Sequence, residues 1–247
     1  MALALVTGGS RGIGKATALR LGQEGYTVAV NYRENRACAE AVADEIIRHG
    51  GQGFCIQADI SDEKQVEAMF AALDNQPQPL KALVNNAGIL LRQSTIEHLS
   101  AERINTVLAT NVTGYILCCR EAVKRMSSRH SGNGGAIVNV SSAAARLGSP
   151  GEYLDYAASK GAVDTLTKGL SLEVADRGIR VNGVRPGFIY TDMHASGGEP
   201  GRVDRVSKSL PMQRGGRPEE VAEAIIWLLS DKASYVTGSI IDLAGGK

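Results

Sequence analysis

Tyr156 and Lys160 are the two residues of this 247-residue chain whose types and spacing best suit chemistry. They lie four positions apart in a stretch that we expect to be helical, so their side chains share one face of the helix. A free tyrosine has a pKa of about 10, and a neighbouring ammonium group favours the phenolate. The pair can therefore give a proton to a reacting oxygen, or take one from it.

Neighbouring residues supply both competitors and helpers for this pair. A tyrosine and a lysine at this spacing are also common on ordinary helices, where they do no chemistry. Tyr153 competes with Tyr156, but the residue four positions after it is Ala157 and not a cation, which favours Tyr156. Ser141 and Ser142 end a short apolar run, where a hydroxyl can donate to a substrate oxygen or simply belong to a turn.

A glycine-rich segment, Thr7-Gly-Gly-Ser-Arg-Gly-Ile-Gly14, follows the first apolar run and opens a predicted helix. Glycines allow a sharp turn and close contact with a pyrophosphate, and the helix N-terminus supplies N–H groups and partial positive charge. The spacing GxxxGxG differs from the usual dinucleotide-binding pattern, so the segment alone is a weak signal. From it we expect cofactor contacts at Gly8, Ser10, Arg11, Gly12, Ile13 and Gly14.

Short apolar runs alternate with longer amphipathic stretches along the whole chain. Strands are expected over Ala2–Thr7, Tyr26–Asn31, Gly53–Ala58, Lys81–Asn85, Ala136–Ser141, Ile179–Arg185 and Ser239–Leu243. Helices are expected over Ile13–Glu24, Arg36–His49, Asp62–Asn75 with Ser61 as N-cap, Ala101–Arg129, Tyr153–Asp176 and Pro218–Ser230. This alternation predicts an α/β fold: a doubly wound, seven-stranded parallel sheet flanked by helices (Rossmann-like), in a single domain over residues 1–247. Ligands of such a sheet bind at the carboxyl ends of its strands.

One long irregular stretch, residues 188–217, interrupts this pattern. It is rich in glycine and poor in apolar residues, and we expect a lid that orders over bound cofactor and substrate; a disordered loop is the alternative. Arg202, Arg205 and Lys208 within it would attract anionic substrates if their charges were free, and a solvated surface is the simpler interpretation.

The composition excludes several other classes of protein. The net charge of +1 gives no case for nucleic acid or a membrane as partner. The four cysteines and four histidines show no metal-binding spacing, so no metal is expected, and the cysteines fit free thiols in the cytoplasm. No targeting segment is recognisable at the N-terminus, and no run approaches the roughly 20 apolar residues of a membrane span.

Four motifs, taken together, resemble those of the short-chain dehydrogenase/reductase family. They are the glycine-rich segment, Asn85-Asn86-Ala87-Gly88 (NNAG), Tyr156-Ala157-Ala158-Ser159-Lys160 (YxxSK) and Arg185-Pro186-Gly187. Their order and spacing match across essentially the whole chain, and the pattern is most similar to 3-oxoacyl-[acyl-carrier-protein] reductases and bacterial glucose 1-dehydrogenases. The resemblance implies an oxidoreductase that interconverts a carbonyl and a secondary alcohol by hydride transfer with a nicotinamide cofactor.

The resemblance also implies roles for single residues. Asn111 matches the family's helix-kinking asparagine, which places a water in a proton relay to Lys160, and Lys160 also holds the cofactor ribose. The second serine of the pair, Ser142, would contact substrate, although its longer separation from Tyr156 leaves Ser141 open. Implied cofactor contacts are Asp59, Ile60, Asn86, Ala87, Gly88, Tyr156, Lys160, Pro186, Gly187, Ile189 and Thr191. Asp59 also fits a simple turn cap, and Thr191 the start of the lid.

The end of the second predicted strand favours NADP(H) over NAD(H). NAD-selective proteins place a carboxylate there for the ribose 2′-hydroxyl, whereas this chain has Asn31-Tyr32-Arg33. Arg33 and Arg11 can pair with a 2′-phosphate. The alternative is that Arg33 is solvated or neutralised by Glu34, which keeps NAD(H) possible.

Substrate and assembly are less determined by the sequence. A 3-oxoacyl thioester, a sugar and a xenobiotic ketone all remain candidates, and Arg125, Arg129 and Arg177 could dock an acidic carrier protein or simply be solvated. Residues 219–229 and 235–246 are apolar stretches that relatives bury between subunits, so we expect a homo-oligomer, a tetramer or a dimer. A non-catalytic nucleotide sensor or an isomerase on the same fold are the rival classes.

Overall fold

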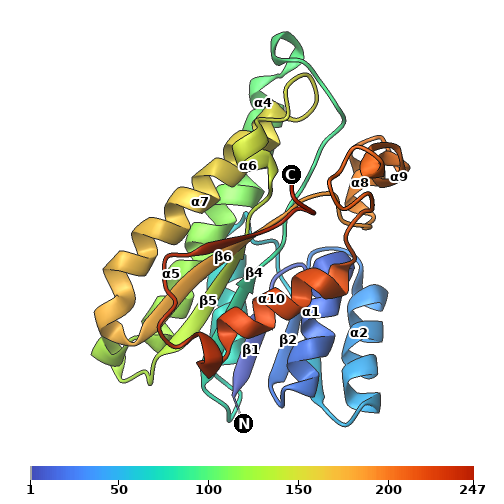
Figure 1. Ribbon diagram of the computed structural model, residues 1–247. Coiled ribbons are helices and arrows are strands. Elements are labelled where there is room, and N and C mark those ends of the chain that lie inside the picture. The colour runs from blue at the N-terminus through green and yellow to red at the C-terminus, as the bar shows by residue number, and fades with distance from the viewer. Residues whose placement is uncertain (1) are drawn as a thin grey trace.

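Seven short apolar runs form the strands of one sheet in the computed structural model, which describes residues 2–247 (Figure 1). The strands are β1 (Leu3–Val6), β2 (Thr27–Tyr32), β3 (Gln52–Gln57), β4 (Leu80–Asn85), β5 (Gly135–Val140), β6 (Ile179–Pro186) and β7 (Ile240–Leu243). They pair in the order β3-β2-β1-β4-β5-β6-β7, and every pair is parallel. The predicted fold class is therefore confirmed.

Helices connect the strands and cover both faces of the sheet. The longer ones are α1 (Gly12–Gln23), α2 (Arg36–Arg48), α3 (Glu63–Leu73), α4 (Ala101–Leu108), α5 (Gly114–Met126), α7 (Leu154–Val174) and α10 (Pro218–Leu229). The short ones are α6 (Ala144–Leu147), α8 (Met193–Ser196) and α9 (Arg202–Ser207), together with 3₁₀ turns at Ile96–His98, Ser128–His130, Ala175–Arg177 and Asp231–Ala233. Within residues 2–247 no helix combines the length and apolar character needed to cross a bilayer.

Two expectations about helix ends and interiors need correction. Ser61 is not the N-cap of α3: the Asp62 side chain accepts from the Gln65 N–H at 3.2 Å, while the Ser61 hydroxyl donates to Asp59. A carboxylate is the stronger acceptor at a helix N-terminus. The helix expected over 101–129 is divided, because a π-helical segment, Ala109–Thr113, separates α4 from α5.

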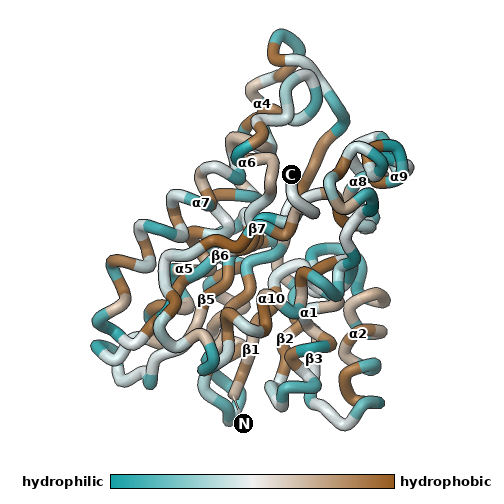
Figure 2. Tube along the Cα trace, viewed as in Figure 1, coloured by the Kyte–Doolittle hydropathy of each residue, from teal (hydrophilic) through white to brown (hydrophobic). Residues whose placement is uncertain are grey.

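The alternation of side chains along β1 builds two separate cores. Ala4 and Val6 pack with α1, α2 and α10 on one face, whereas Leu3 and Leu5 pack with α3, α5 and α7 on the other. Apolar segments accordingly follow the strands in the centre of the molecule, and polar ones lie outside (Figure 2). With both faces covered, only the strand ends remain for polar chemistry.

The strand order reverses at β1, which lies between β2 and β4. Crossovers lead to opposite sides at this point, and a cleft opens outside the carboxyl ends of the strands. Residues 188–217 lie above this edge and hold α8 and α9 (Figure 1). This segment is less irregular than its sequence indicates, because Val203 and Leu210 are buried and Ile189 pairs with Gly216 in an isolated bridge.

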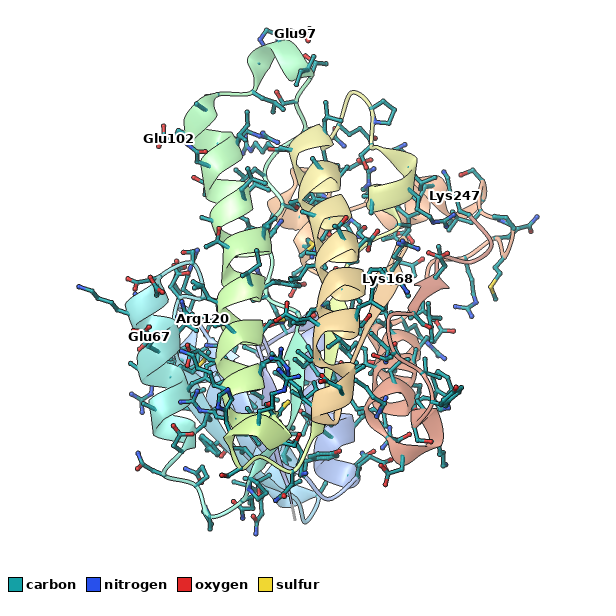
Figure 3. All side chains as sticks on the ribbon, turned by 90° about the vertical axis from the view of Figure 1, so that its left-hand side faces the viewer. Glu67, Glu97, Glu102, Arg120, Lys168 and Lys247 are labelled. Carbon is teal, nitrogen blue, oxygen red and sulfur yellow. The ribbon has the colours of Figure 1, made fainter. Side chains whose placement is uncertain are left out.

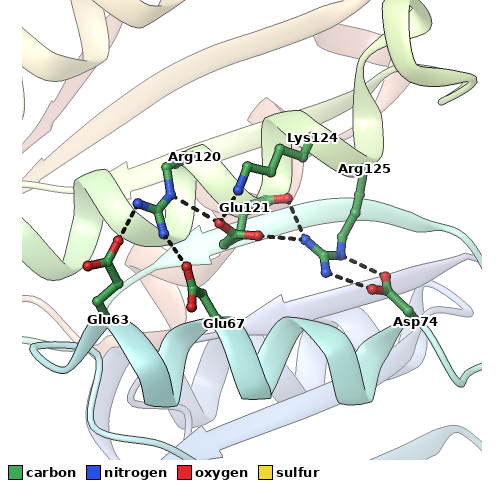
Figure 4. A network of polar contacts seen from close by, with 7 residues as sticks. All are labelled: Glu63, Glu67, Asp74, Arg120, Glu121, Lys124 and Arg125. Carbon is green, nitrogen blue, oxygen red and sulfur yellow. Dashed lines mark hydrogen bonds and ion pairs between the residues drawn. The ribbon is translucent and has the colours of Figure 1, made fainter.

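A polar network connects α5 to α3 on the face of the sheet that α3, α5 and α7 cover (Figure 4). Glu121 of α5 is 4% exposed and accepts from Arg120 at 3.0 Å, Lys124 at 2.7 Å and Arg125 at 3.0 Å. Arg120 and Arg125 also bind carboxylates of α3 and of the residue that follows it, namely Glu63, Glu67 and Asp74. Burial raises the pKa of Glu121, but the three cations outweigh it and hold the pKa below its usual value.

Replacing the central carboxylate, Glu121→Gln, should lower the free energy of unfolding by about 1–3 kcal/mol, because three cations lose their shared partner. A carboxyl group with a lowered folded pKa stabilises the protein above its unfolded pKa of about 4.3, and this contribution is lost as the pH falls through the folded pKa. Urea unfolding at pH 7 and at acid pH measures the difference between variant and wild type.

The matched control is Glu24→Gln. The side chain of Glu24 is nearly half exposed and forms an ion pair with Arg20, one turn earlier in the chain. Its effect should stay below about 0.5 kcal/mol. An equal loss in both variants would mean that the buried network adds nothing beyond an exposed ion pair.

Candidate active site

Tyr156, Lys160, Ser141 and Ser142 line one pocket at the carboxyl edge of the sheet. Tyr156 and Lys160 lie one turn apart on α7, and the Lys160 ammonium is 5.6 Å from the centre of the Tyr156 ring. The two serines directly follow β5. The structure thus brings together the residues that the helix and strand patterns place at one edge.

Lys160 is the most deeply buried cation of the site, at 2% exposure. Its ammonium donates to the Val140 carbonyl at 2.8 Å and to the Tyr115 hydroxyl at 3.3 Å. Burial lowers its pKa to about 7, against the opposing charge of Asp164. Tyr115 escaped the sequence reasoning, and its position four residues after Asn111 on a helix is the signal that could have found it.

Burial has the largest effect on the pKa of the Tyr156 hydroxyl. Burial raises the pKa of Tyr156 to about 12, and a hydrogen bond with Ser142 opposes the rise only in part. Desolvation of the phenolate is thus the largest effect on this pKa, and the expectation that the Lys160 ammonium and an oxidised nicotinamide favour the phenolate stays a prediction. At neutral pH Tyr156 is a proton donor.

The two serines differ in how their hydroxyls are used. The Ser141 hydroxyl donates to the Lys160 carbonyl at 3.1 Å, so its proton is engaged inside the protein. The Ser142 oxygen accepts from the Ala144 N–H at 3.1 Å and its proton remains for Tyr156 or a ligand. This arrangement favours Ser142 as the group that contacts substrate.

Asn111 lies fully buried within the π-helical segment. Its side chain bonds both backbone groups of Ile89, at 2.9 Å and 3.1 Å, and donates to the Ser159 hydroxyl at 3.1 Å. The Ser159 hydroxyl in turn bonds the Tyr156 carbonyl. Asn111 thus supports the catalytic helix, and its relay to Lys160 stays a prediction.

A second and larger cleft, of about 410 Å³, adjoins this pocket. It is lined by Gly8, Ser10, Arg11, Gly12, Ile13, Asn31, Arg33, Glu34, Asn35, Cys38, Ala58, Asp59, Ile60, Asn86, Ala87, Gly88, Ile89, Thr110, Thr191, Asp192 and Met193. The expected cofactor residues Pro186, Gly187 and Ile189 line the smaller pocket instead, beside Tyr156 and Lys160. Gly14 lines neither and lies beneath the loop.

The conformation of the loop between β1 and α1 requires glycine at several positions. Gly8 and Gly12 both have positive φ, of 61° and 54°, which favours glycine. A Cβ on Gly14 would lie 2.3 Å from the Gly8 carbonyl and 2.5 Å from the Asn86 amide, so only glycine allows the loop to close on the helix. The Asn86 side chain holds the loop by donating to the Thr7 and Gly8 carbonyls, each at 3.0 Å.

The end of β2 carries no carboxylate. The side chain of Asn31 there accepts from the Gly8 N–H. Arg33 is half exposed in the cleft, and its guanidinium lies 2.6 Å from Glu34 and 4.0 Å from Asp59. Asp59 binds the Ser61 N–H and hydroxyl. Arg33 is therefore partly neutralised, while Arg11 is exposed and lines the same cleft.

Residues 188–217 supply several further pocket residues, of which only Arg202 was considered from the sequence, as a possible attractor of anions. Phe188, Met193, His194 and Arg202 line the smaller pocket. Tyr153, considered only as a competitor of Tyr156, donates to the Gly197 carbonyl at 3.1 Å and so contacts residues 188–217. No local motif marks these residues, because they meet only when the chain folds back over the strand ends.

Comparisons with known proteins agree with this geometry. The family model described as enoyl-(acyl carrier protein) reductase matches residues 8–247. The uncharacterized oxidoreductase YgfF of Escherichia coli K12 is 74% identical over 247 residues, all of both chains. The 3-oxoacyl-[acyl-carrier-protein] reductase FabG of Staphylococcus aureus is 41% identical over 243 residues, 98% of this chain and 96% of its own.

A nicotinamide-dependent oxidoreductase on a Rossmann-like sheet is the class that this fold and these relatives define. The chain belongs to the short-chain dehydrogenase/reductase family.

Removing the proposed proton donor, Tyr156→Phe, should lower kcat by at least about 10²-fold, because a general acid contributes that much to proton transfer. Cofactor binding, followed by fluorescence titration, should change little. The control Tyr153→Phe loses only a bond to the lid, so it should act on KM more than on kcat. Near-normal kcat in Tyr156→Phe would refute the assignment.

The lowered pKa of Lys160 predicts a pH-dependent stability of the cofactor-free protein. The unfolded chain binds this proton up to pH of about 10, whereas the folded chain releases it near 7, so the unfolded state binds more protons between these values. Stability relative to Lys160→Met should therefore rise from pH 6 to pH 9. Urea unfolding at both values measures it; the exposed Lys168→Met (Figure 3) should show no such change.

Proposed function

We propose that the chain reduces a carbonyl to a secondary alcohol with NADPH, and that a 3-oxoacyl thioester is the leading substrate class. The observation that carries the proposal is the shared wall of the two cavities. Ile13, Asn86, Thr191 and Met193 line both, so a dinucleotide in the large cleft reaches the pocket that holds Tyr156.

The residues of the pocket have distinct tasks in this reaction. A bound reduced nicotinamide supplies the hydride for the carbonyl carbon. The Ser142 hydroxyl donates to the carbonyl oxygen and orients it, and Tyr156 gives the proton, which its raised pKa keeps available at pH 7. Lys160 would hold the ribose hydroxyls of the cofactor from the same side, with Asn111 supporting the helix beneath.

The preference for NADP(H) rests on charge at the end of β2. β2 ends in Asn31-Tyr32 and Arg33 follows, with no carboxylate to repel a 2′-phosphate, and Arg11 and Arg33 line the same cleft. Glu34 pairs with Arg33, but both side chains are at least half exposed and an exposed ion pair contributes little. A 2′-phosphate carries more charge than Glu34 and can displace it.

The thioester class comes from the relatives that bear the name 3-oxoacyl-[acyl-carrier-protein] reductase. Docking of an acidic carrier has less support, because each candidate arginine already has carboxylates of this chain nearby. Arg125 binds Asp74 and Glu121 (Figure 4), Arg129 binds Asp176, and Arg177 lies within 4 Å of Glu173 and Asp176. We therefore propose free thioesters or other small ketones. A sugar is less suited to a pocket with so many apolar walls.

Assembly and location are proposed on exposure and on the cysteines. Trp227 is 40% exposed on α10 and Tyr235 is fully exposed nearby, which fits burial in a homo-oligomer, a tetramer or a dimer. All four cysteines are free thiols, as expected in the cytoplasm. Residues 188–217 would act as the lid, held by Tyr153 and by the ion pairs of Arg202 with Glu152 and Glu199.

Initial rates with acetoacetyl-N-acetylcysteamine, a free 3-oxoacyl thioester, test the proposal. NADPH should exceed NADH in kcat/KM by about tenfold or more, and the double variant Arg11→Ala, Arg33→Ala should remove most of that ratio. Arg36→Ala is the control, since Arg36 is exposed, pairs with Glu40 and lies outside the cleft. A wild-type preference for NADH, or an unchanged ratio in the double variant, would contradict the cofactor assignment; glucose oxidation exceeding thioester reduction would contradict the substrate class.

A further inference from the structure

Arg202 is a buried cation in the wall of a pocket that is otherwise mostly apolar. It belongs to α9 of the lid and is 6% exposed. Among residues 2–247, the ionisable side chains that line this pocket are Tyr153, Tyr156, Lys160, His194 and Arg202. Lys160 serves the catalytic side, so the charge state of the lid side depends on Arg202 and His194.

Two aromatic rings and two carboxylates contact the guanidinium of Arg202. Its carbon lies 5.0 Å from the centre of the Tyr153 ring and 5.4 Å from that of Phe188, and both rings line the pocket. One terminal nitrogen donates to Glu152 at 3.0 Å and to Glu199 at 3.1 Å, and the other donates to Glu152 as well. Its terminal nitrogens are thus engaged by carboxylates before any ligand arrives.

The charges around Arg202 cancel. Arg205 binds Glu199 and lies 3.9 Å from Glu152, so two arginines face two carboxylates. Burial lowers the pKa of His194, which is therefore neutral at pH 7, and Lys247, 5.5 Å from the Phe188 ring, lies outside the pocket. The lid side therefore presents an aromatic and guanidinium wall without net charge.

An anionic substrate meets two costs in such a pocket. Its carboxylate loses water on entering an apolar cavity, and no free cation on the lid side replaces that water. To bind Arg202 it must compete with Glu152 and Glu199, both already in place. A neutral carbonyl compound meets neither cost and can pack against the two rings.

We propose that Arg202, neutralised by Glu152 and Glu199, is a specificity-determining residue that makes the enzyme select uncharged carbonyl substrates over carboxylate-bearing ones. This inference rests on the proposed carbonyl reduction. From the sequence, the arginines of the lid could attract anionic substrates. In the structure these arginines are paired with carboxylates of the same chain, so they do not offer that attraction.

Two variants shift the charge of the lid wall in opposite directions. Glu152→Gln leaves the wall with one uncompensated positive charge, and Arg202→Met leaves it with one uncompensated negative charge. Both break the same ion pair, so damage to the lid would change both variants in the same direction. Only an effect of charge on selectivity predicts opposite changes.

The experiment measures selectivity between methyl acetoacetate and acetoacetate, which differ by a methyl ester in place of a carboxylate. Wild type should favour the ester in kcat/KM by at least about tenfold. Glu152→Gln should narrow that ratio severalfold, and Arg202→Met should widen it. Glu223→Gln, which makes the same change of overall charge on α10 away from the pocket, should leave the ratio unchanged.

Calorimetric binding of both compounds to the same four proteins, each saturated with oxidised cofactor, gives a readout that does not require turnover. If turnover occurs but both variants shift the ratio in the same direction, or neither shifts it, the role of Arg202 is refuted. If the binding ratios shift as expected while no carbonyl compound is reduced, the charge selection stands and the proposed function fails. If Arg202→Met does not fold, an unchanged ratio in Glu152→Gln still refutes the proposal.

Discussion

The buried ammonium of Lys160 is the constraint on which the rest of the site depends. A cation at 2% exposure is costly, and here it is supported by the Val140 carbonyl at the end of β5 and by the Tyr115 hydroxyl of α5. Those two groups join Lys160 of α7 to the sheet and to α5. The same support leaves the ammonium beside Tyr156 and close to where a cofactor would lie, so the cost of burial is tied to the chemistry.

The parallel sheet explains why the polar groups of the site gather at this edge. Both faces of the sheet are filled by apolar layers, and the two cores meet only through the strands. Backbone carbonyls and short polar side chains at the strand ends, such as Asn31, Asn86 and Ser142, are therefore the natural support for a dinucleotide and its substrate. The π-helical segment adds Asn111 from the side, where a regular α-helix would turn it elsewhere.

The sequence was sufficient to predict the parts of the site that local patterns encode. The glycine loop, the spacing of Tyr156 and Lys160, and the strand-end serines each have a local physical reason, and they meet in one region. What the sequence could not supply were energies set by tertiary burial. The raised pKa of Tyr156 and the pairing of Arg202 depend on residues far away in the chain. The sequence left open whether the arginines of residues 188–217 attract anions or are solvated, whereas the structure pairs Arg202 with carboxylates.

The segment 188–217 is held in part by ion pairs and by a tyrosine hydrogen bond, and these polar contacts have a physical consequence. Val203 and Leu210 bury some apolar area beneath it, but the bonds that join it to the segment before Tyr156 are Arg202 to Glu152 and Tyr153 to Gly197. When such a segment moves away, its polar groups exchange these bonds for bonds with water at little net cost in free energy. An apolar contact would lose its full burial free energy in the same movement. Glu152 lies only four residues before Tyr156, so its contact with Arg202 also joins residues 188–217 to the segment that leads into α7. The pairing of Arg202, the attachment of residues 188–217 and the support of the segment before Tyr156 thus share one set of side chains, and a change in any of them would affect all three.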